Sequence, residues 1–267
     1  MVFPPSFWLV VAVAFAISAI GFHNYIWFFS VGYGLSIAGE GLLLLLLFPR
    51  ELSLGTALCC VIFIVYGLRL GGYLLYRELK LKSYHKHLGD DIKDSKAIPL
   101  VAKLSIWFFC AVLYVTMVCP VFYRLHNGSG SDLFTYIGAA LMLLGFLLET
   151  AADQQKKAAK AIQPHRFVDT GLYRFVRCPN YLGELILWTG VLVTGFGSLT
   201  GAGQWVLALI GYLGILYVMF SGARRLELRQ NKTYGADPEY RKYSTTVPIL
   251  LPFIPLYSVV KHKWLVA

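Results

Sequence analysis

Long apolar runs dominate the sequence and limit the folds that are open to it. Seven runs cover residues 6–22, 25–48, 54–76, 104–123, 133–149, 181–199 and 204–221. Each is close to the ~20 residues that a helix needs to cross a bilayer. Hydrophobic residues make up 57% of the chain and charged residues only 14%, whereas soluble domains average about 25% charged residues. The sequence therefore predicts an all-α fold, a polytopic membrane bundle of about seven transmembrane helices built as one membrane domain over residues 1–267.

Basic residues are distributed unevenly among the connections between these runs. Loop 77–103 holds seven Lys and Arg, loop 150–179 holds six, and the tail after residue 221 holds eight, against two on the opposite side, Arg50 and Arg124. Because basic loops stay on the cytosolic side, we predict a lumenal or external N-terminus and a cytosolic C-terminus. The membrane would be the endoplasmic reticulum in a eukaryote and the inner membrane in a bacterium. These loops account for the net charge of +10, so no nucleic-acid partner is expected.

Cysteine usage gives no sign of a metal or disulfide framework. The chain has five cysteines without a C-x-x-C pair, at positions 59, 60, 110, 119 and 178. We interpret them as small apolar residues and expect no zinc site.

A basic loop runs directly into the sixth apolar run. Pro179 is typical of the first turn of a helix, and a helix N-terminus suits an anion because its backbone N–H groups are free. Arg166, Arg174 and Arg177 add forked donors for phosphate. The simpler interpretation is a positively charged loop that marks the cytosolic end of a membrane helix.

That simpler interpretation does not explain two polar residues inside the following run. Asn180 and Glu184 lie on adjacent turns of one predicted helix, at i and i+4. An ionisable group within a membrane segment is costly, so Glu184 is a functional candidate.

The order of residues in this stretch carries a resemblance. Gly171-Leu172-Tyr173, Arg174, Pro179-Asn180-Tyr181-Leu182-Gly183-Glu184 and Trp188 resemble the signature of the steroid 5-alpha-reductase superfamily, in a branch related to membrane sterol reductases. Residues 130–257 resemble the C-terminal domain of the steroid reductases, and the first 100 residues match loosely. The resemblance implies an NADPH-dependent oxidoreductase that reduces an activated C=C bond in a steroid, sterol or other lipid. No Rossmann G-x-G-x-x-G is present, so NADPH would lie among membrane helices and their cytosolic loops.

A polar face follows the fifth apolar run. Glu149, Asp153 and Lys157 are spaced i, i+4, i+8, which places them on one helical face at the cytosolic boundary. A helix that becomes amphipathic where it leaves the membrane explains this spacing equally well. The superfamily resemblance implies cofactor contacts here.

The third run carries Arg69, Tyr73 and Arg77 on one face. The pattern Gly-Leu-Arg-Leu, then Tyr, then Arg is similar to the superfamily's third helix, where an arginine contacts the cofactor and a tyrosine contacts substrate. Tyr73 and Tyr76 both compete for the tyrosine position. Arg77 has a second interpretation, in which it snorkels to the cytosolic surface.

Glu40 is the only charged residue of the second run, and it lies between Gly39 and Gly41. A carboxyl buried without a partner is held protonated, which is the state that donates to a substrate carbonyl. The steroid reductases have a Gln-Glu pair on this helix, and here Gly39 replaces the Gln, so the match is partial. The competing interpretation is a structural pair between Glu40 and Arg69.

The tail completes the resemblance. Glu227 and the run Gly235-x-x-Pro-x-Tyr240-x-x-Tyr243 are similar to the superfamily's C-terminal cytosolic segment, although an interfacial basic helix with aromatic anchors explains them as well. The catalytic candidates are Glu40, Tyr73 and Tyr76. The cofactor-binding candidates are Arg69, Arg77, Glu149, Asp153, Lys157, His165, Arg166, Tyr173, Arg174, Arg177, Asn180, Tyr181, Glu184, Glu227, Tyr240 and Tyr243.

Two other functions remain open at this point. Isoprenylcysteine and phospholipid methyltransferases, which use S-adenosylmethionine, share an Arg-x-Pro-x-Tyr-x-Gly pattern and a later Glu. Arg177, Pro179, Tyr181, Gly183 and Glu227 fit that pattern too. The residues that favour a reductase are Asn180, Glu184, Glu149 and Asp153. The third possibility is a lipid-binding or assembly protein without activity, and the sequence names neither the substrate nor the oligomeric state.

Overall fold

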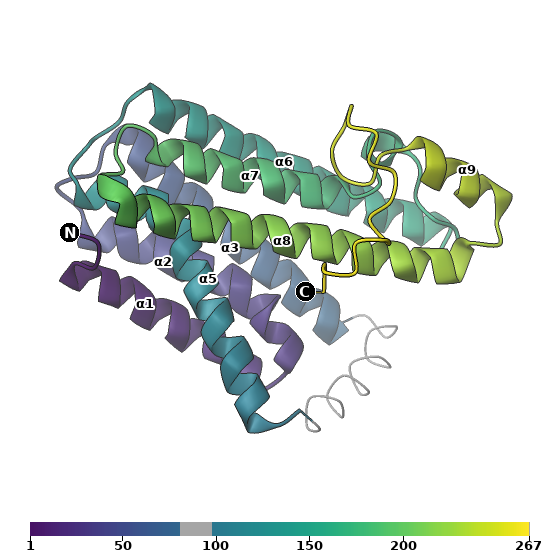
Figure 1. The fold of residues 1–267 in the computed structure, drawn as a ribbon, viewed down its shortest axis with the longest axis horizontal. Coiled ribbons are helices and arrows are strands. Elements are labelled where there is room, and N and C mark those ends of the chain that lie inside the picture. Colours follow the sequence, from purple (N-terminus) through teal and green to yellow (C-terminus); the bar gives the residue numbers. More distant parts are fainter. Residues whose placement is uncertain (81–97, 267) are drawn as a thin grey trace. The chain divides into compact units, whose positions relative to one another are not determined.

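Helices make up most of the part that the structure describes, and the C-terminal segment after α9 is irregular (Figure 1). This computed structural model describes residues 1–80 and 98–266, with only the backbone for residues 77–80. Within these ranges all regular structure is helical, which confirms the predicted all-α class. Most of the basic loop 77–103 lies outside the described residues.

The helices follow the predicted apolar runs closely. They are α1 (Pro5–Ser18), η1 (Ala19–Phe22), η2 (Tyr25–Phe28), α2 (Val31–Leu47), α3 (Leu54–Lys80), α5 (Leu100–His126), α6 (Leu133–Ile162), η3 (Gly171–Arg174), α7 (Pro179–Gly195), α8 (Gly201–Tyr234) and α9 (Pro238–Thr246). Among the described residues, six helical stretches are long and apolar enough to cross a membrane. The remaining predicted run corresponds to α7, which has 17 residues. The chain is thus a multi-pass membrane protein, and the orientation of its termini stays a prediction.

Tertiary packing divides the chain into two compact units. Unit 1 comprises Met1–Ala139 and Val191–Tyr212. Unit 2 comprises Ala140–Gly190 and Leu213–Ala267. Each unit holds its own set of candidate functional residues.

In unit 1, glycines bring α2 and α3 into backbone contact. A Cβ on Gly34 would lie 2.6 Å from the backbone nitrogen of Gly71, and a Cβ on Gly67 would overlap the carbonyl oxygen of Gly34. Gly67 and Gly71 form the small-xxx-small spacing that lets membrane helices approach closely. The close approach fixes the face that α2 presents to α3. That face includes Gly34, Ala38 and Gly41.

Arg124, in the last turn of α5, binds several backbone segments of unit 1. The side chain is 1% exposed and donates to the carbonyl oxygens of Thr194 (2.6 Å), Phe196 (2.7 Å) and Gly130 (2.9 Å). It also forms an ion pair with Asp132 at 2.9 Å. Burial raises the pKa of Asp132, but hydrogen bonds from Thr135 and Arg124 outweigh that effect and hold the pKa below its ordinary value. Arg124 therefore fixes the connections that flank α5 and α7 rather than serving as a free surface charge.

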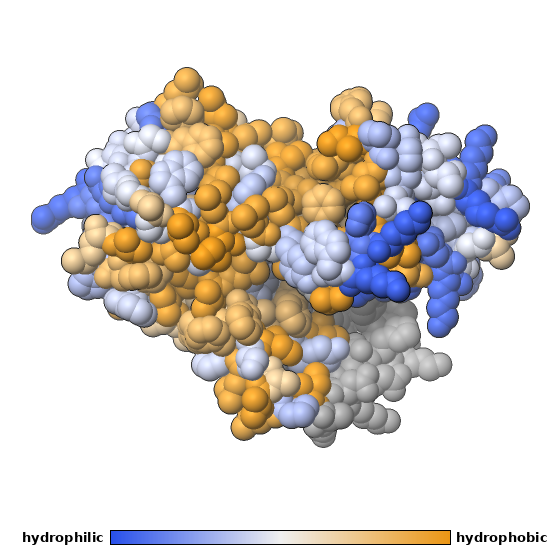
Figure 2. Space-filling model, in the orientation of Figure 1, coloured by the Kyte–Doolittle hydropathy of each residue, from blue (hydrophilic) through white to orange (hydrophobic). Residues whose placement is uncertain are grey.

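The surface of the chain is rich in exposed apolar side chains, as a lipid-facing protein requires. Leu46, Phe109 and Leu213 are 69%, 70% and 59% exposed. Apolar residues cover much of the face in Figure 2, and hydrophilic residues gather around α9 and the C-terminal part of α8. This pattern agrees with a basic, solvent-facing end of unit 2.

Candidate functional site

In unit 2, α6 and α7 cross in backbone contact at two glycines. A Cβ on Gly183 would lie 2.7 Å from both the carbonyl oxygen of Gly145 and the backbone nitrogen of Glu149. No larger residue fits at either glycine without moving a helix. The crossing places Glu149 against α7, where it is 2% exposed, and Glu184 of α7 is 8% exposed. Unit 2 thus holds two buried carboxyl groups from facing helices, both of them predicted cofactor contacts.

The Gly-Leu-Tyr part of the motif is a turn that docks on α6. Gly171 has a φ of +61°, and a Cβ there would overlap the side-chain oxygen of Gln155. That oxygen accepts a hydrogen bond from the backbone N–H of Leu172 at 2.8 Å. The Tyr173 hydroxyl donates to the carbonyl oxygen of Ala152 at 3.3 Å. Tyr173 and Gly171 therefore hold the basic loop on α6.

Arg177 and Glu227 form a buried ion pair. The Arg177 Nη2 to Glu227 Oε1 distance is 2.9 Å, and the side chains are 1% and 3% exposed. The second Glu227 oxygen accepts from the Val259 N–H at 2.9 Å, and Arg177 also donates to the carbonyl oxygen of Tyr257. The Nε and Nη1 groups of Arg177 have no hydrogen-bond partner among the described residues. The pair ties the loop, α8 and the C-terminal segment together.

The start of α7 is held by the same C-terminal segment. The backbone N–H groups of Arg177 and Cys178 donate to the carbonyl oxygens of Pro248 (2.9 Å) and Ile249 (3.0 Å). α7 begins at Pro179, as predicted. Burial raises the pKa of the Cys178 thiol to about 12, although Arg177 and Lys156 oppose the shift. The thiol is therefore neutral and serves as a small apolar group.

Three other predicted cofactor ligands make contacts inside the protein. Arg166 pairs with Asp169 at 2.7 Å and with Glu239 at 2.5 Å. Next to it, the Phe167 ring lies 5.3 Å from Tyr240 and 5.4 Å from Tyr243, centroid to centroid.

The hydroxyl groups of both tyrosines are engaged as well. The Tyr240 hydroxyl donates to Asn231, and that of Tyr243 donates to the carbonyl oxygen of Tyr173, both at 2.8 Å. The first bond attaches α9 to α8, and the second attaches α9 to the loop.

The remaining predicted ligands in unit 2 differ in exposure. Asn180 is half-buried, and His165, Lys157 and Arg174 are exposed. Asp153 is half-buried on the same face of α6 as Glu149 and Lys157, so this face runs from the buried part of unit 2 to its surface. Tyr181 packs on α8, where a Cβ on Gly222 would lie 3.3 Å from its ring.

Unit 1 holds the other candidates, of which Glu40 is the most deeply buried. Glu40 is 0% exposed, and neither of its carboxyl oxygens has a hydrogen-bond partner among the described residues. The alternative pairing of Glu40 with Arg69 is therefore not made. The Arg69 guanidinium instead lies 5.7 Å from the centroid of the Tyr73 ring.

The two candidate tyrosines of α3 differ in exposure. Tyr73, under Arg69, is half-buried, whereas Tyr76 is 53% exposed. The side chain of Arg77 lies outside the described residues. The contact with Arg69 makes Tyr73 the better-positioned of the two.

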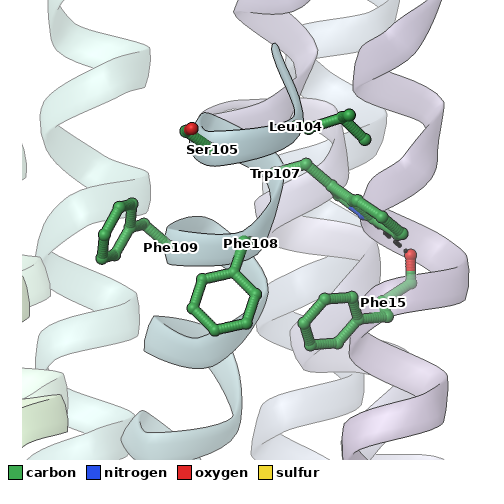
Figure 3. A pocket seen from close by; sticks show the side chains of 6 residues that line it. All are labelled: Phe15, Leu104, Ser105, Trp107, Phe108 and Phe109. Carbon is green, nitrogen blue, oxygen red and sulfur yellow. Dashed lines mark hydrogen bonds between the residues drawn. The ribbon is translucent and has the colours of Figure 1, made fainter. Parts of the chain in front are cut away.

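A surface groove in unit 1 contains none of the candidates (Figure 3). It is lined by Phe15 of α1 and by Leu104, Ser105, Trp107, Phe108 and Phe109 of α5. The Trp107 indole N–H donates to the carbonyl oxygen of Phe15 at 3.0 Å and joins the two helices. Its lining is almost wholly apolar, and the one hydroxyl, that of Ser105, donates to the carbonyl oxygen of Val101 in its own helix. We therefore interpret the groove as an irregularity of the lipid-facing surface.

Comparison with known proteins decides the family. A family described as "Protein of unknown function (DUF1295)", within the steroid 5-alpha-reductase superfamily, matches residues 15–247. The chain belongs to this family. The predicted resemblance is thereby confirmed, and it covers most of unit 1 as well as unit 2.

Individual relatives are distant. The chain is 24% identical to 3-oxo-5-alpha-steroid 4-dehydrogenase 1 of Bos taurus, over 61% of this chain and 60% of the relative. It is also 24% identical to an uncharacterised protein of Schizosaccharomyces pombe, over 56% of this chain and 46% of the relative. The match thus spans about half the length of these relatives, and no solved structure matches. The relationship indicates a membrane oxidoreductase family.

Proposed function

We propose that this protein is an NADPH-dependent membrane reductase of an activated C=C bond in a steroid, sterol or other lipid. The observation that carries the proposal is membership of the steroid 5-alpha-reductase superfamily over residues 15–247. The named activity of the Bos taurus relative supports an oxidoreductase and a hydrophobic substrate. The apolar surface of the helices gives such a substrate access from the bilayer.

The residues of unit 2 fit a phosphate-bearing cofactor. Arg177 has two buried N–H groups without partners among the described residues, and buried donors of this kind bind anionic oxygens strongly. Lys157 and Arg174 are exposed cations, and Asn180 offers a half-buried amide. These four side chains would hold the phosphate and ribose groups. NADPH, when bound, supplies a hydride.

The other predicted ligands of unit 2 serve to position these four. Arg166 is occupied by two carboxylates, and Tyr240 and Tyr243 anchor α9 to the loop. Their contribution to cofactor binding would be to hold the loop in place.

In unit 1, Glu40 is suited to proton donation. A neutral carboxyl in an apolar environment donates a hydrogen bond or a proton to a substrate carbonyl, and general acids of this kind contribute about 10²–10⁴-fold to rate. Tyr73, which contacts Arg69, would make a separate substrate contact, because the glycine contacts place Glu40 opposite the part of α3 near Cys60 and Phe63. Burial of Glu40 keeps solvent water from competing for that proton.

The residues that also fit the methyltransferase pattern have structural roles in this geometry. Arg177 and Glu227 pair with each other, and Gly183 permits the α6–α7 crossing. Pro179 begins α7 and Tyr181 packs on α8. The shared pattern therefore has a structural explanation that does not require S-adenosylmethionine.

Asn180→Ala is expected to weaken NADPH binding by about 1–3 kcal/mol, the loss that follows when a buried hydrogen bond is removed. The free energy of unfolding should hardly change, because the Asn180 side chain makes no hydrogen bond to the described protein. Titration of NADPH into purified protein in lipid nanodiscs measures the affinity. Asn127→Ala is the matched control: its amide donates to the carbonyl oxygen of Ser198 at 2.8 Å in unit 1, so its removal should lower stability and leave NADPH affinity intact. Equal affinity for wild type and Asn180→Ala would remove Asn180 from the cofactor site.

A further inference from the structure

The C-terminal segment of unit 2 contains a loop in which every side chain is apolar. Residues 249–256 read Ile-Leu-Leu-Pro-Phe-Ile-Pro-Leu. A hydrogen bond of 2.8 Å from the Ile249 N–H to the Leu256 carbonyl oxygen closes the loop. At its tip, Phe253 is 100% exposed and Ile254 is 50% exposed. Contiguous exposed apolar side chains mark a surface that contacts a membrane or another molecule, so the loop requires a partner.

The backbone at the tip of the loop holds Phe253 in this exposed position. Its φ is +66°, the one positive value among the described residues other than glycine. A large side chain in the left-handed region is sterically unfavourable, and it persists where the surrounding structure imposes it. The base of the loop supplies that constraint, because Ile249 and Leu250 are 1% and 0% exposed.

The base of the loop lies close to the apolar part of α7. The N–H groups of Arg177 and Cys178 donate to the carbonyl oxygens of Pro248 and Ile249. Both donors come just before the apolar run of α7, which begins at residue 181. This separation is about one helical turn. The loop therefore leaves unit 2 at the level where α7 enters the membrane.

After the loop, the chain runs back along α8, and Figure 1 shows this yellow segment passing across the helix. The Val259 N–H donates to Glu227 at 2.9 Å. Arg224 donates to the carbonyl oxygens of Val260 and Leu265, both at 3.2 Å. The segment thus follows α8 from Glu227 toward the apolar run of that helix.

Trp264 lies beside the apolar run of α8. The Tyr217 hydroxyl donates to the Trp264 carbonyl oxygen at 3.1 Å, and the two rings are stacked with centroids 6.1 Å apart. Tyr217 belongs to the apolar run, which ends at residue 221. The ten residues of helix from Glu227 to Tyr217 span about 15 Å. Trp264 is 66% exposed, so a large aromatic side chain is presented at the end of the membrane-spanning part of α8.

The chemistry of the segment fits a lipid surface better than a protein partner. Val259 and Leu265 are 1% and 3% exposed, whereas Lys261, Lys263 and Trp264 are exposed. Tryptophan next to lysine is typical of the membrane interface, where the ring lies at the level of the headgroups and the cation lies near anionic lipid. Lysine is depleted from the centres of protein–protein interfaces.

We propose that residues 249–265 bind the bilayer surface, with the rings of Phe253 and Trp264 inserted between the lipid headgroups and the acyl chains. Lys261 and Lys263 then lie beside the lipid phosphates. The apolar runs of α7 and α8 are joined by a short turn, so the start of α7 and the end of the α8 run lie on one side of the membrane, and both rings enter the same leaflet. The proposal is independent of the cofactor and of the reaction.

Spin labels test this insertion in the full chain, reconstituted into nanodiscs of phosphatidylcholine and phosphatidylglycerol. Phe253→Cys and Trp264→Cys would each carry a nitroxide. The five native cysteines are buried, and wild type treated with the same reagent gives their background. Collisions with oxygen report the acyl region, and collisions with a water-soluble nickel complex report water. We expect both labels to lie about 5–10 Å below the lipid phosphates, with a loss of nickel collisions.

Two control positions in unit 2 calibrate the labels. Leu213→Cys, at a site 59% exposed within the apolar run of α8, reports the acyl chains. Lys242→Cys, at an exposed site on α9, reports water. Labels at 253 and 264 that meet the nickel complex as often as the label at 242 would overturn the proposal.

A second copy of the chain is the other possible occupant of this surface, and the same samples reveal it. The labels would then be protected from both reagents, and their spectra would show spin–spin broadening that disappears on dilution with unlabelled protein. That result would overturn the proposal as well. Because Phe253 is fully exposed, its replacement removes no packing, and its label alone decides the question if Trp264→Cys fails to fold.

Discussion

Arg177→Met is expected to lower the free energy of unfolding by about 3–5 kcal/mol, the cost of leaving one member of a buried ion pair without the other. Glu227 would then keep a buried negative charge whose remaining hydrogen-bond donor, among the described residues, is the Val259 N–H. Denaturant unfolding in detergent micelles, followed by tryptophan fluorescence, measures the change.

Two further variants isolate the cause of this loss. The double variant Arg177→Met, Glu227→Leu should recover much of the stability, since no orphaned charge remains. Arg166→Met removes an arginine that also has carboxylate partners, but its side chain is 36% exposed, so it should cost less than about 1 kcal/mol. A cost for Arg177→Met as small as that for Arg166→Met would show that the buried pair does not hold unit 2 together.

Glu40→Gln is expected to lower turnover by about 10²-fold or more, because an amide keeps a hydrogen-bond donor but cannot act as a general acid. NADPH affinity should not change, since Glu40 is not among the residues proposed to hold the cofactor. The free energy of unfolding should not fall either, because no described residue pairs with the carboxyl group. Reduction of a 3-oxo steroid with a conjugated C=C bond, followed by NADPH absorbance, provides the assay.

Glu51→Gln serves as the control for this charge change. Glu51 is exposed just beyond the end of α2, so its replacement should leave turnover at the wild-type level. Unchanged turnover in Glu40→Gln would exclude Glu40 from the reaction.

The sequence was sufficient for the features that depend on local pattern. Hydropathy located the apolar part of each membrane helix, since a bilayer imposes both length and composition on each span, whereas α6 and α8 continue well beyond their apolar runs. Pro179 marked the first residue of α7 because proline suits the first turn and no later one. The polar face of Glu149, Asp153 and Lys157 lies on one helix as predicted, because α6 continues past its apolar run.

Tertiary partners of the charged residues could not be predicted in the same way. The arginines of the basic loop looked equivalent as phosphate ligands. In the structure Arg177 is paired with Glu227, Arg166 with Asp169 and Glu239, and Arg174 is exposed. Asp169, three residues after Arg166, was the one partner with a local signal. Glu227 and Glu239 come from distant parts of the chain.

Residues that support the loop were missed for a related reason. Gln155 fixes the turn at Gly171, and its only sequence signal was the glycine that it contacts. The contact between Gly145 and Gly183 joins two different helices, so no spacing within one helix reveals it. On α2, burial of Glu40 was predicted from its apolar neighbours, whereas the absence of an Arg69 pair depends on how α3 packs.

The central claim, a reductase rather than a methyltransferase, is tested most directly by cofactor binding. Purified protein in nanodiscs would be titrated with NADPH and, separately, with S-adenosylmethionine in a calorimeter. We predict saturable binding of NADPH that Asn180→Ala weakens, and no binding of S-adenosylmethionine. Saturable binding of S-adenosylmethionine with no heat from NADPH would contradict the account.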